Sequence, residues 1–493
     1  MSARHLVSLR HSKAINMLQT ACAITAGALM LCWPAFRNGF PIVFSDTGTY
    51  IDSYLGTVES LFLPHFDRPD WYGGVIALFS VQHQLWGVVL AQAWIGAWLI
   101  RELVRGVSVR RPLITTSIIC ALCAIATPLP LLVSTLMPDA WLSFGFLAAA
   151  ALCVPGRTSV LRSLLLATVV LAAGMTGSSH AVILIGSLTA VVLSRLWMRF
   201  DVRRPLSVIA ICVAALLVLS AGNWSAFNHF RPVEGAQIFL FARLVQDGSM
   251  DKVLPQYCAQ RSDHPVCRNE KEILASHLGK VIVWSPLAQA IDGWQDKNGD
   301  LANLNRLVVH KELPSLFAKS ARNSLRLFFE QSASSMQDFY RGPYDEESAQ
   351  YAVIRRTYPL EARPYLKALQ QSDELDTPLT STWLGLCWIS AFGSMAYALV
   401  VLVRGWLLKH EPSSAAILAV LALGGSMVNA IVSASLSGVV LRYEARTSAI
   451  VLPIMLACLA MQLNNRRKQD ASVVTNLVLS EPEIRIFLAY EHS

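Results

Sequence analysis

The sequence predicts an all-α polytopic membrane protein with about ten transmembrane helices and a mostly helical extracytoplasmic domain. Of its 493 residues, 54% are hydrophobic and only 15% are charged, whereas about a quarter of the residues of a soluble protein are charged. The apolar residues form long runs, and short basic clusters flank those runs. This pattern is typical of membrane topology, so the formal charge of +8 does not indicate a nucleic-acid partner.

Each expected span is an apolar stretch bounded by polar or basic residues. The first follows Arg4, Arg10 and Lys13 but is too long for a signal peptide, so we expect it to remain uncleaved. The expected spans are 14–36, 84–100, 112–129, 139–154, 160–175, 181–198, 206–226, 381–403, 413–433 and 445–463.

The positive-inside rule orients these spans. With a cytoplasmic N-terminus, the basic clusters at 101–111, 157–162, 195–204, 404–409 and 466–468 all fall on the cytoplasmic side. The opposite short loops are richer in acidic residues. We therefore expect a multi-pass protein of a bacterial inner (plasma) membrane, with both termini in the cytoplasm.

This topology divides the chain into four parts. Residues 1–230 form an N-terminal membrane module with an outer loop at 37–83, and residues 231–380 form a mostly helical periplasmic domain. Residues 381–465 hold the C-terminal transmembrane helices, and 466–493 form a cytoplasmic tail.

Two features of the 231–380 segment lead to specific expectations. Helical periodicity extends from 303 to 331, and Pro314 is expected to break it into two helices. Cys258 and Cys267 share this polar segment, and in an oxidising space they are expected to form a disulfide. The alternative is a pair of unpaired thiols.

Polar groups from five places in the sequence converge on the predicted outer face. They are Asp46 in the stretch 44–50, Arg68 with Tyr72, Asp139, His180, and the segment Arg442-Tyr443-Glu444-Ala445-Arg446. Ionisable groups at membrane depth are costly and are often functional.

Each of these groups also has a purely structural interpretation. Asp46 suits a turn, and Asp139 after Pro138 suits a helix N-cap. His180 suits a hydrated interfacial position, while Arg442 and Arg446 suit snorkelling anchors.

The arrangement resembles the GT-C superfamily of polytopic glycosyltransferases, which use sugars linked to lipid phosphates. In that superfamily a carboxylate in the first outer loop, near an aromatic residue, serves in catalysis, as Asp46 with Tyr50 would here. Arg68-Pro69 followed by Tyr72 resembles its R-P-x-x-Y element, and Arg442-Tyr443 followed by Pro453 resembles its R-Y…P element. Many members carry paired acids where this chain has Ser45-Asp46-Thr47, so a second acid would come from elsewhere, with Asp139 as the candidate.

Sugar transfer from a lipid phosphate needs a base for the acceptor hydroxyl and cations for the leaving phosphate. Asp46 is the candidate base, and Arg68, Arg442 and Arg446 are candidate phosphate ligands, since guanidinium binds phosphate bidentately. Tyr50, Tyr72, His180 and Tyr443 complete the expected substrate-binding set. The expected partners are a polyprenyl-phosphate-linked sugar donor, a glycan or lipid acceptor of the envelope, and membrane lipids; no cofactor is certain, and a divalent metal is left open.

Two other classes of function stay open. A transporter or flippase of a lipid-linked or envelope glycan would need ionisable groups or broken helices near mid-membrane, whereas the expected spans carry almost no charge at their centres. A non-catalytic subunit of an envelope assembly would need no cluster of carboxylates and arginines. An outward-facing site that holds Asp46 and an arginine would favour the enzyme.

Overall fold

The structure, a computed structural model, is helical throughout the residues it describes. These are 3–59, 68–80, 84–154, 159–194, 201–275, 282–283, 285–291, 293, 296, 299–330, 335–340, 342–408, 413–436 and 440–480. Within these ranges the extended pairing is an isolated bridge between Ile42 and Thr135. The helices that build the bundle are α1 (Ala3–Leu31), α2 (Trp33–Asn38), α3 (Thr47–Glu59), α4 (Trp71–Phe79), α5 (Trp86–Gly106), α6 (Pro112–Ala126), α7 (Leu129–Ser134), α8 (Asp139–Cys153), α9 (Val160–Thr176), α10 (Ser178–Ser194), α11 (Arg203–Phe227), α22 (Pro378–Leu408), α23 (Ser413–Leu436) and α24 (Leu441–Ser480).

The segment between α11 and α22 is also helical, but its helices are mostly short. They are α12 (Ala236–Gln246), α13 (Val253–Cys258), α14 (Pro265–Arg268), α15 (Glu270–Ala275), α17 (Pro286–Ala290), α18 (Asp300–Glu330), α19 (Gln337–Tyr340), α20 (Ala349–Thr357), η3 (Pro359–Glu361), α21 (Ala362–Leu366) and η4 (Leu369–Gln371).

Among the described residues, six helices are long and apolar enough to cross a membrane, namely α1, α5, α11, α22, α23 and α24. The chain is therefore consistent with a helical membrane protein. The four other expected spans coincide with α6, α8, α9 and α10, which are apolar but have at most 17 residues. A count of ten crossings accordingly stays a prediction.

The shortness of α8 has a physical reason. Its 15 residues extend about 22 Å at 1.5 Å per residue, less than the roughly 30 Å of a hydrocarbon core. Almost every residue of α8 is buried inside the protein, because α5, α9, α23 and α24 surround it. At Gly145 a Cβ atom would lie 2.9 Å from the Cβ of Ala173, so α8 and α9 pack as closely as their backbones allow. A helix surrounded by protein in this way does not itself have to match the thickness of the bilayer.

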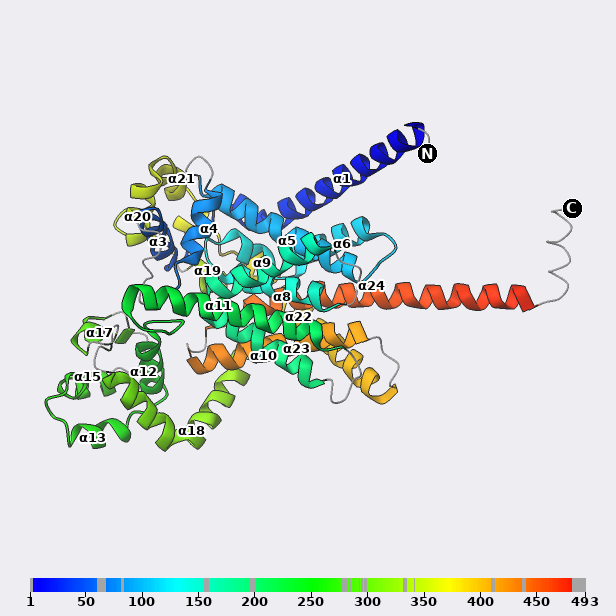
Figure 1. Ribbon diagram of the computed structural model, residues 1–493. Coiled ribbons are helices and arrows are strands. Elements are labelled where there is room, and N and C mark those ends of the chain that lie inside the picture. Colours follow the sequence, from blue (N-terminus) through cyan, green and yellow to red (C-terminus); the bar gives the residue numbers. More distant parts are fainter. Residues whose placement is uncertain are drawn as a thin grey trace, which may run out of the picture.

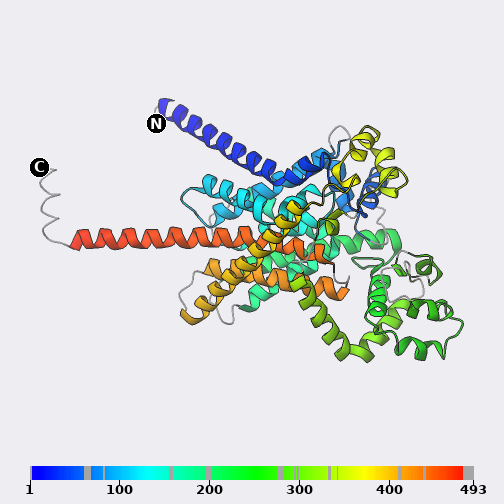
Figure 2. The ribbon, with the colours of Figure 1, turned by 180° about the vertical axis from the view of Figure 1, so that it is seen from behind.

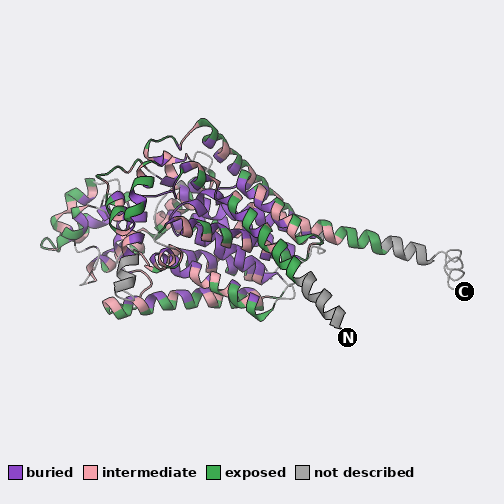
Figure 3. Cartoon of the chain, turned by 90° about the horizontal axis from the view of Figure 1, so that it is seen from above, coloured by how far each residue is buried: buried purple, intermediate pink, exposed green. Residues whose placement is uncertain are grey.

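The two ends of the bundle hold different parts of the chain. Figures 1 and 2 show the N-terminus of α1 and the C-terminal part of α24 projecting from the same side of the molecule, while α3, α12, α20 and α21 gather on the opposite side. Buried residues fill the body of the bundle, and exposed residues line the projecting part of α24 (Figure 3). Both chain ends therefore lie away from the end that holds the short helices.

The 231–380 segment contributes to two large hydrophobic cores, and Leu327 forms a third, small cluster with Ala430 and Ala434. One contains Ile238, Phe241 and Leu254 together with Leu304 from the start of α18. The disulfide expected between Cys258 and Cys267 is present in this part. Residues from 336 onward instead belong to the core of the bundle, through buried side chains such as Tyr351, Tyr358 and Tyr365.

The expected break at Pro314 is wrong, because α18 is one helix from Asp300 to Glu330 with Pro314 inside it. Figures 1 and 2 show the helix bent near its middle. Proline removes one backbone hydrogen bond and bends a helix without having to end it. The first half of α18 packs in the core of α12 and α13, and its second half packs against α23. Packing at both ends therefore outweighs the local cost of the proline.

Candidate functional site

The stretch 44–50 is held at the end of the bundle opposite the termini. The N–H of Ile42 donates to the carbonyl of Ser134 and the N–H of Leu136 donates to the carbonyl of Ile42, both at 2.9 Å. The hydroxyl of Thr47 donates to the carbonyl of Leu136 at 3.0 Å. Because Thr47 is also the first residue of α3, Asp46 is fixed in the turn that leads into this helix.

A second set of contacts comes from residues more than 300 positions away. The side chain of Gln370 accepts from the N–H of Val43 and donates to its carbonyl, each at 2.9 Å. The side chain of Gln350 donates to the carbonyl of Ser45 at 2.7 Å. These two amides lock the backbone on both sides of Phe44, so the segment after α18 positions the stretch that carries Asp46.

The side chain of Asp46 is partly exposed and faces a cation. It is 34% exposed, and its Oδ2 atom lies 3.6 Å from Nη1 of Arg68. The guanidinium of Arg68 lies 5.1 Å from the ring centroid of Tyr50, and the ring of Tyr50 meets that of Tyr72 edge-on at 5.2 Å. Asp46 therefore lies in a turn, as its structural interpretation requires. It is also the first of a series of side chains in contact, which continues through Arg68 and Tyr50 to Tyr72.

Tyr72 anchors this series of side chains in the bundle. Its hydroxyl donates to the side-chain oxygen of Gln92 at 3.0 Å, and the amide nitrogen of Gln92 donates to the carbonyl of Val133 at 3.0 Å. Gln92 is fully buried in α5. Its burial inside an apolar span requires such partners, and they fix where the ring of Tyr72 lies.

A buried ion cluster lies beside this series of side chains. The carboxylate of Asp139, at the start of α8, pairs with Nε of Arg446 and lies 3.4 Å from Nη1 of Arg442. The side chain of Asp139 is only 2% exposed. Arg442 and Arg446 are four residues apart on α24 and so project from the same face of the helix. All three charges are therefore removed from solvent together.

Two structural interpretations of this cluster are wrong. Asp139 is not an N-cap, because Pro138 occupies the cap position and Asp139 begins the helix. Arg442 and Arg446 are not snorkelling anchors, because both are buried. A buried carboxylate needs cations close by, and this requirement fixes the positions of both arginines.

Aromatic rings cover the two arginines. The guanidinium of Arg442 lies 3.7 Å from the ring centroid of Phe44, and that of Arg446 lies 4.2 Å from the ring centroid of Tyr443. Phe44 is two residues from Asp46, and the charge of Asp46 acts on Arg442. The Asp46 series and the Asp139 cluster therefore form one site.

His180 belongs to the same site but does not meet solvent. It is buried at the start of α10, and its Nδ1 lies 3.2 Å from the carbonyl oxygen of Ala173. It interacts electrostatically with Asp139 and Arg446. Any side chain at Gly177 would clash, because a Cβ atom there would lie 2.9 Å from the ring of His180. The hydrated interfacial interpretation of His180 is therefore wrong.

The structure thus brings together the predicted catalytic and substrate-binding residues, which are Asp46, Tyr50, Arg68, Tyr72, Asp139, His180, Arg442, Tyr443 and Arg446. Asp67, which precedes Arg68, lies outside the described residues. Sequence reasoning missed Gln92, Gln350 and Gln370. For Gln92 a signal exists, because a glutamine in the middle of an apolar span needs a buried partner. No sequence signal links the other two to the site.

Glu444 lies between the two arginines in sequence but does not face Asp139. It is fully buried, and its carboxyl accepts from the amide of Asn429 at 2.8 Å and from the hydroxyl of Thr447 at 3.2 Å. Asn429 belongs to α23. Glu444 therefore joins α24 to α23, while Arg442 and Arg446 form the ion cluster with α8.

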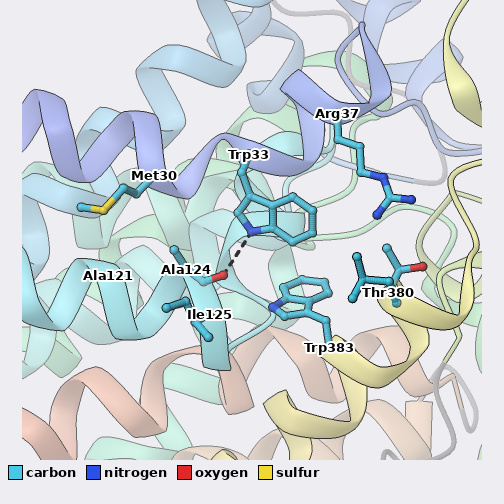
Figure 4. Close-up of a pocket in the computed structure, with 9 residues that line it drawn as sticks. Met30, Trp33, Arg37, Ala121, Ala124, Ile125, Thr380 and Trp383 are labelled. Atoms are coloured by element: carbon cyan, nitrogen blue, oxygen red, sulfur yellow. Dashed lines mark hydrogen bonds between the residues drawn. The ribbon is translucent and has the colours of Figure 1, made fainter.

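A cavity of about 460 Å³ lies between α1, α2, α6 and α22. Trp33, Trp383 and Met30 line it, with Arg37 at one end, and Trp33 donates to the carbonyl of Ala124 at 3.1 Å (Figure 4). None of the predicted site residues lines this cavity. Within the described ranges, no group of three or more His, Cys, Asp or Glu side chains is placed to hold a metal ion.

No family model, curated protein or solved structure matches this chain.

Proposed function

We propose that this protein is an integral membrane glycosyltransferase that moves a sugar from a polyprenyl-phosphate donor to an acceptor hydroxyl. The observation that carries the proposal is a partly exposed carboxylate, Asp46, beside the buried guanidinium of Arg442. The Nη1 atom of Arg442 is paired with Asp139, but its Nε is buried and makes no hydrogen bond to any residue that the structure describes. A buried donor without an acceptor is costly, and a phosphate oxygen would satisfy it.

The balance of charge supports an anionic ligand. Three guanidinium groups, on Arg68, Arg442 and Arg446, meet two carboxylates, on Asp46 and Asp139, which leaves one positive charge. The balance counts only the groups that form these ion pairs; the carboxyl of Glu444 is bonded to the neutral side chains of Asn429 and Thr447 and pairs with no described arginine. A phosphate diester linked to a sugar carries one negative charge and would neutralise the excess.

The two acids suit different tasks. Asp139 is enclosed by two arginines and is only 2% exposed, so an acceptor could not reach it, and its role would be to position the arginines. Asp46 is 34% exposed and, among the described residues, forms an ion pair with Arg68 alone. Asp46 is therefore the candidate base, and the absence of a neighbouring second acid is explained if Asp139 acts only through Arg442 and Arg446.

The reaction then proceeds as one displacement. The acceptor hydroxyl oxygen forms a bond to the anomeric carbon of the sugar while the bond from that carbon to the phosphate oxygen breaks. Asp46 takes the hydroxyl proton, and the bonding electrons leave with the lipid phosphate, whose charge Arg442 stabilises. Arg446 and the rings of Phe44 and Tyr443 keep Arg442 in place.

The proposed location is the outer face of a bacterial inner membrane. The site lies at the end of the bundle opposite both chain ends (Figure 1), and the basic clusters of the sequence assign those ends to the cytoplasm. The disulfide between Cys258 and Cys267 on the site side suits an oxidising space.

The test compares Asp46→Asn with Asp52→Asn in purified protein in lipid nanodiscs. Asp52 is a matched control because it is 38% exposed, pairs with Arg356 and is also near the start of α3. A panel of polyprenyl-phosphate hexoses and pentoses is supplied with a membrane glycolipid extract, and release of polyprenyl phosphate is measured. Asp46→Asn should lose activity by about 100-fold or more, whereas Asp52→Asn should stay within about two-fold of the wild type.

Full activity of Asp46→Asn would remove Asp46 from the base role. No release by the wild-type protein from any donor of the panel would contradict the glycosyltransferase proposal itself.

A further inference from the structure

A row of exposed apolar side chains winds along α18. Leu313, Phe317, Ala321, Leu325 and Phe329 are spaced four residues apart, so they form one ridge that turns by about 40° around the helix from each side chain to the next. All five are exposed, and the two phenylalanines are 78% and 62% exposed. Large exposed apolar side chains that are neighbours on a surface mark a region that something else covers.

The second half of α18 packs directly on two helices of spanning length. Its Ser320 hydroxyl bonds that of Ser435 on α23, and Leu327 packs with Ala430 and Ala434 of the same helix. The ring of Phe328 meets that of Phe392, in the middle of α22, at 6.1 Å. Half of α18 is thus attached to the wall of the bundle and not only to the core of α12 and α13.

These contacts define how deep the ridge lies. Ala430 precedes Leu436, the last residue of α23, by six residues, which is about 9 Å along the helix. Phe328 contacts a residue near the centre of the apolar helix α22. The exposed neighbour of Phe328, Phe329, therefore lies at the level of the spanning helices.

The surface beside the ridge is also apolar. Met427, Ile431 and Leu436 of α23 are each about half exposed, as expected for side chains that face lipid. On α18 the adjacent row carries Arg322, which is exposed. An apolar row flanked by basic residues is typical of a helix that lies in a membrane interface.

We propose that the second half of α18 lies in the lipid bilayer at the site end of the bundle. Leu325 and Phe329 then contact acyl chains, while Phe317, three residues before the Ser320 that meets the last turn of α23, lies toward the phosphate headgroups with Arg322. Lipid is the occupant that the structure favours, because the ridge continues the exposed apolar surface of α23. The inference does not depend on the glycosyltransferase proposal.

The experiment measures the depth of single labels on the full chain in phosphatidylcholine and phosphatidylglycerol nanodiscs. Cys22, the exposed free cysteine, is replaced by serine; the other free cysteines are buried, and Cys258 and Cys267 are bonded. Leu325→Cys and Phe329→Cys then carry a fluorophore. Glu346→Cys is the aqueous control, because Glu346 is charged and exposed.

Lipids brominated on their acyl chains should quench the labels at 325 and 329 at least two-fold, while aqueous iodide should leave them nearly unchanged. The label at 346 should show the reverse. Equal quenching by iodide at all three positions would overturn the proposal, since the ridge would then face water. Insensitivity of 325 and 329 to both quenchers would also overturn it, because a protein surface such as a second copy of the chain would then cover the ridge.

Discussion

Two buried carboxylates, Asp139 and Glu102, each meet two arginines, near opposite ends of the bundle. Asp139 pairs with Arg442 and Arg446 where α8 begins. Glu102, near the end of α5, pairs with Arg101 and Arg162. Both acids are almost completely buried. By composition alone the two clusters are nearly the same.

The two clusters differ in the further contacts that their arginines make. Arg162 also donates to the backbone carbonyl of Glu102 at 2.6 Å, so it ties α9 to the C-terminal part of α5, and its Nε pairs with the Glu102 carboxylate. Arg442 lies on the ring of Phe44. Its Nη1 faces the Asp139 carboxylate, whereas its buried Nε makes no hydrogen bond to any described residue. A partly exposed acid, Asp46, lies nearby. The Glu102 cluster is therefore a clasp, that is, an ion cluster that joins two helices. The Asp139 cluster can in addition bind a ligand.

The largest expected effect comes from Arg442→Gln. Under the glycosyltransferase proposal this change removes the guanidinium that stabilises the leaving phosphate, and we expect transfer to fall by about 100- to 1,000-fold. The thermal midpoint should fall less than in Arg162→Gln, because each acid keeps one arginine but only Arg162 also bonds the backbone of a neighbouring helix. Polyprenyl-phosphate release and thermal unfolding are measured on the same nanodisc preparations.

Arg162→Gln is the matched control and carries the second prediction. Arg101 still pairs with Glu102 in this variant, but the change removes the buried ion pair and the backbone bond by which Arg162 joins α9 to α5. We expect a loss of about 3 kcal/mol of stability, the lower end of the cost of breaking a buried ion pair. Activity per folded molecule should nevertheless stay within about three-fold of the wild type, because Arg162 lies far from Asp46 along α9 and α5. If Arg162→Gln lost activity as fully as Arg442→Gln while remaining folded, the distinction between clasp and ligand site would fail.

The sequence alone could not distinguish the Glu102 cluster, which joins two helices, from the Asp139 cluster, which can bind a ligand. Charge bias along the chain was enough to collect Asp46, Asp139, His180, Arg442 and Arg446 at one end, and the structure does bring them together. The same bias marked Arg162 only as a cytoplasmic cation. Its pairing with Glu102 depends on how α5 and α9 pack, which hydrophobic periodicity does not specify.

Other features of the molecule also differ in whether the sequence alone could predict them. The disulfide was predictable because Cys258 and Cys267 are the two cysteines of one polar segment. The clamp of Gln350 and Gln370 on the Asp46 stretch was not predictable, because it joins residues more than 300 positions apart. The continuity of α18 through Pro314 also depends on tertiary packing, which outweighs a local preference.

The smallest expected effect concerns a third buried acid, Glu361. Its carboxyl accepts from the N–H of Leu85 at 3.0 Å, and no ion pair to it is found in the part of the chain that the structure describes. Burial raises the pKa of the Glu361 carboxyl above its usual range, and the bond from Leu85 offsets only part of that rise. A carboxyl whose pKa is raised on folding contributes stability that is lost as pH increases through that range, because the folded state holds its proton more tightly than the unfolded chain.

Glu361→Gln keeps an acceptor for Leu85 but cannot ionise. Below the ordinary carboxyl pKa the variant and the wild type should therefore have the same stability. Above the raised pKa the variant should be slightly more stable, by about 1 kcal/mol for each unit of difference between the two pKa values. Thermal unfolding between acidic and neutral pH measures this difference, with Glu374→Gln as an exposed control. A variant less stable than the wild type at neutral pH would mean that the ionised acid is compensated after all, and Glu361 would then belong with Glu102 and Asp139.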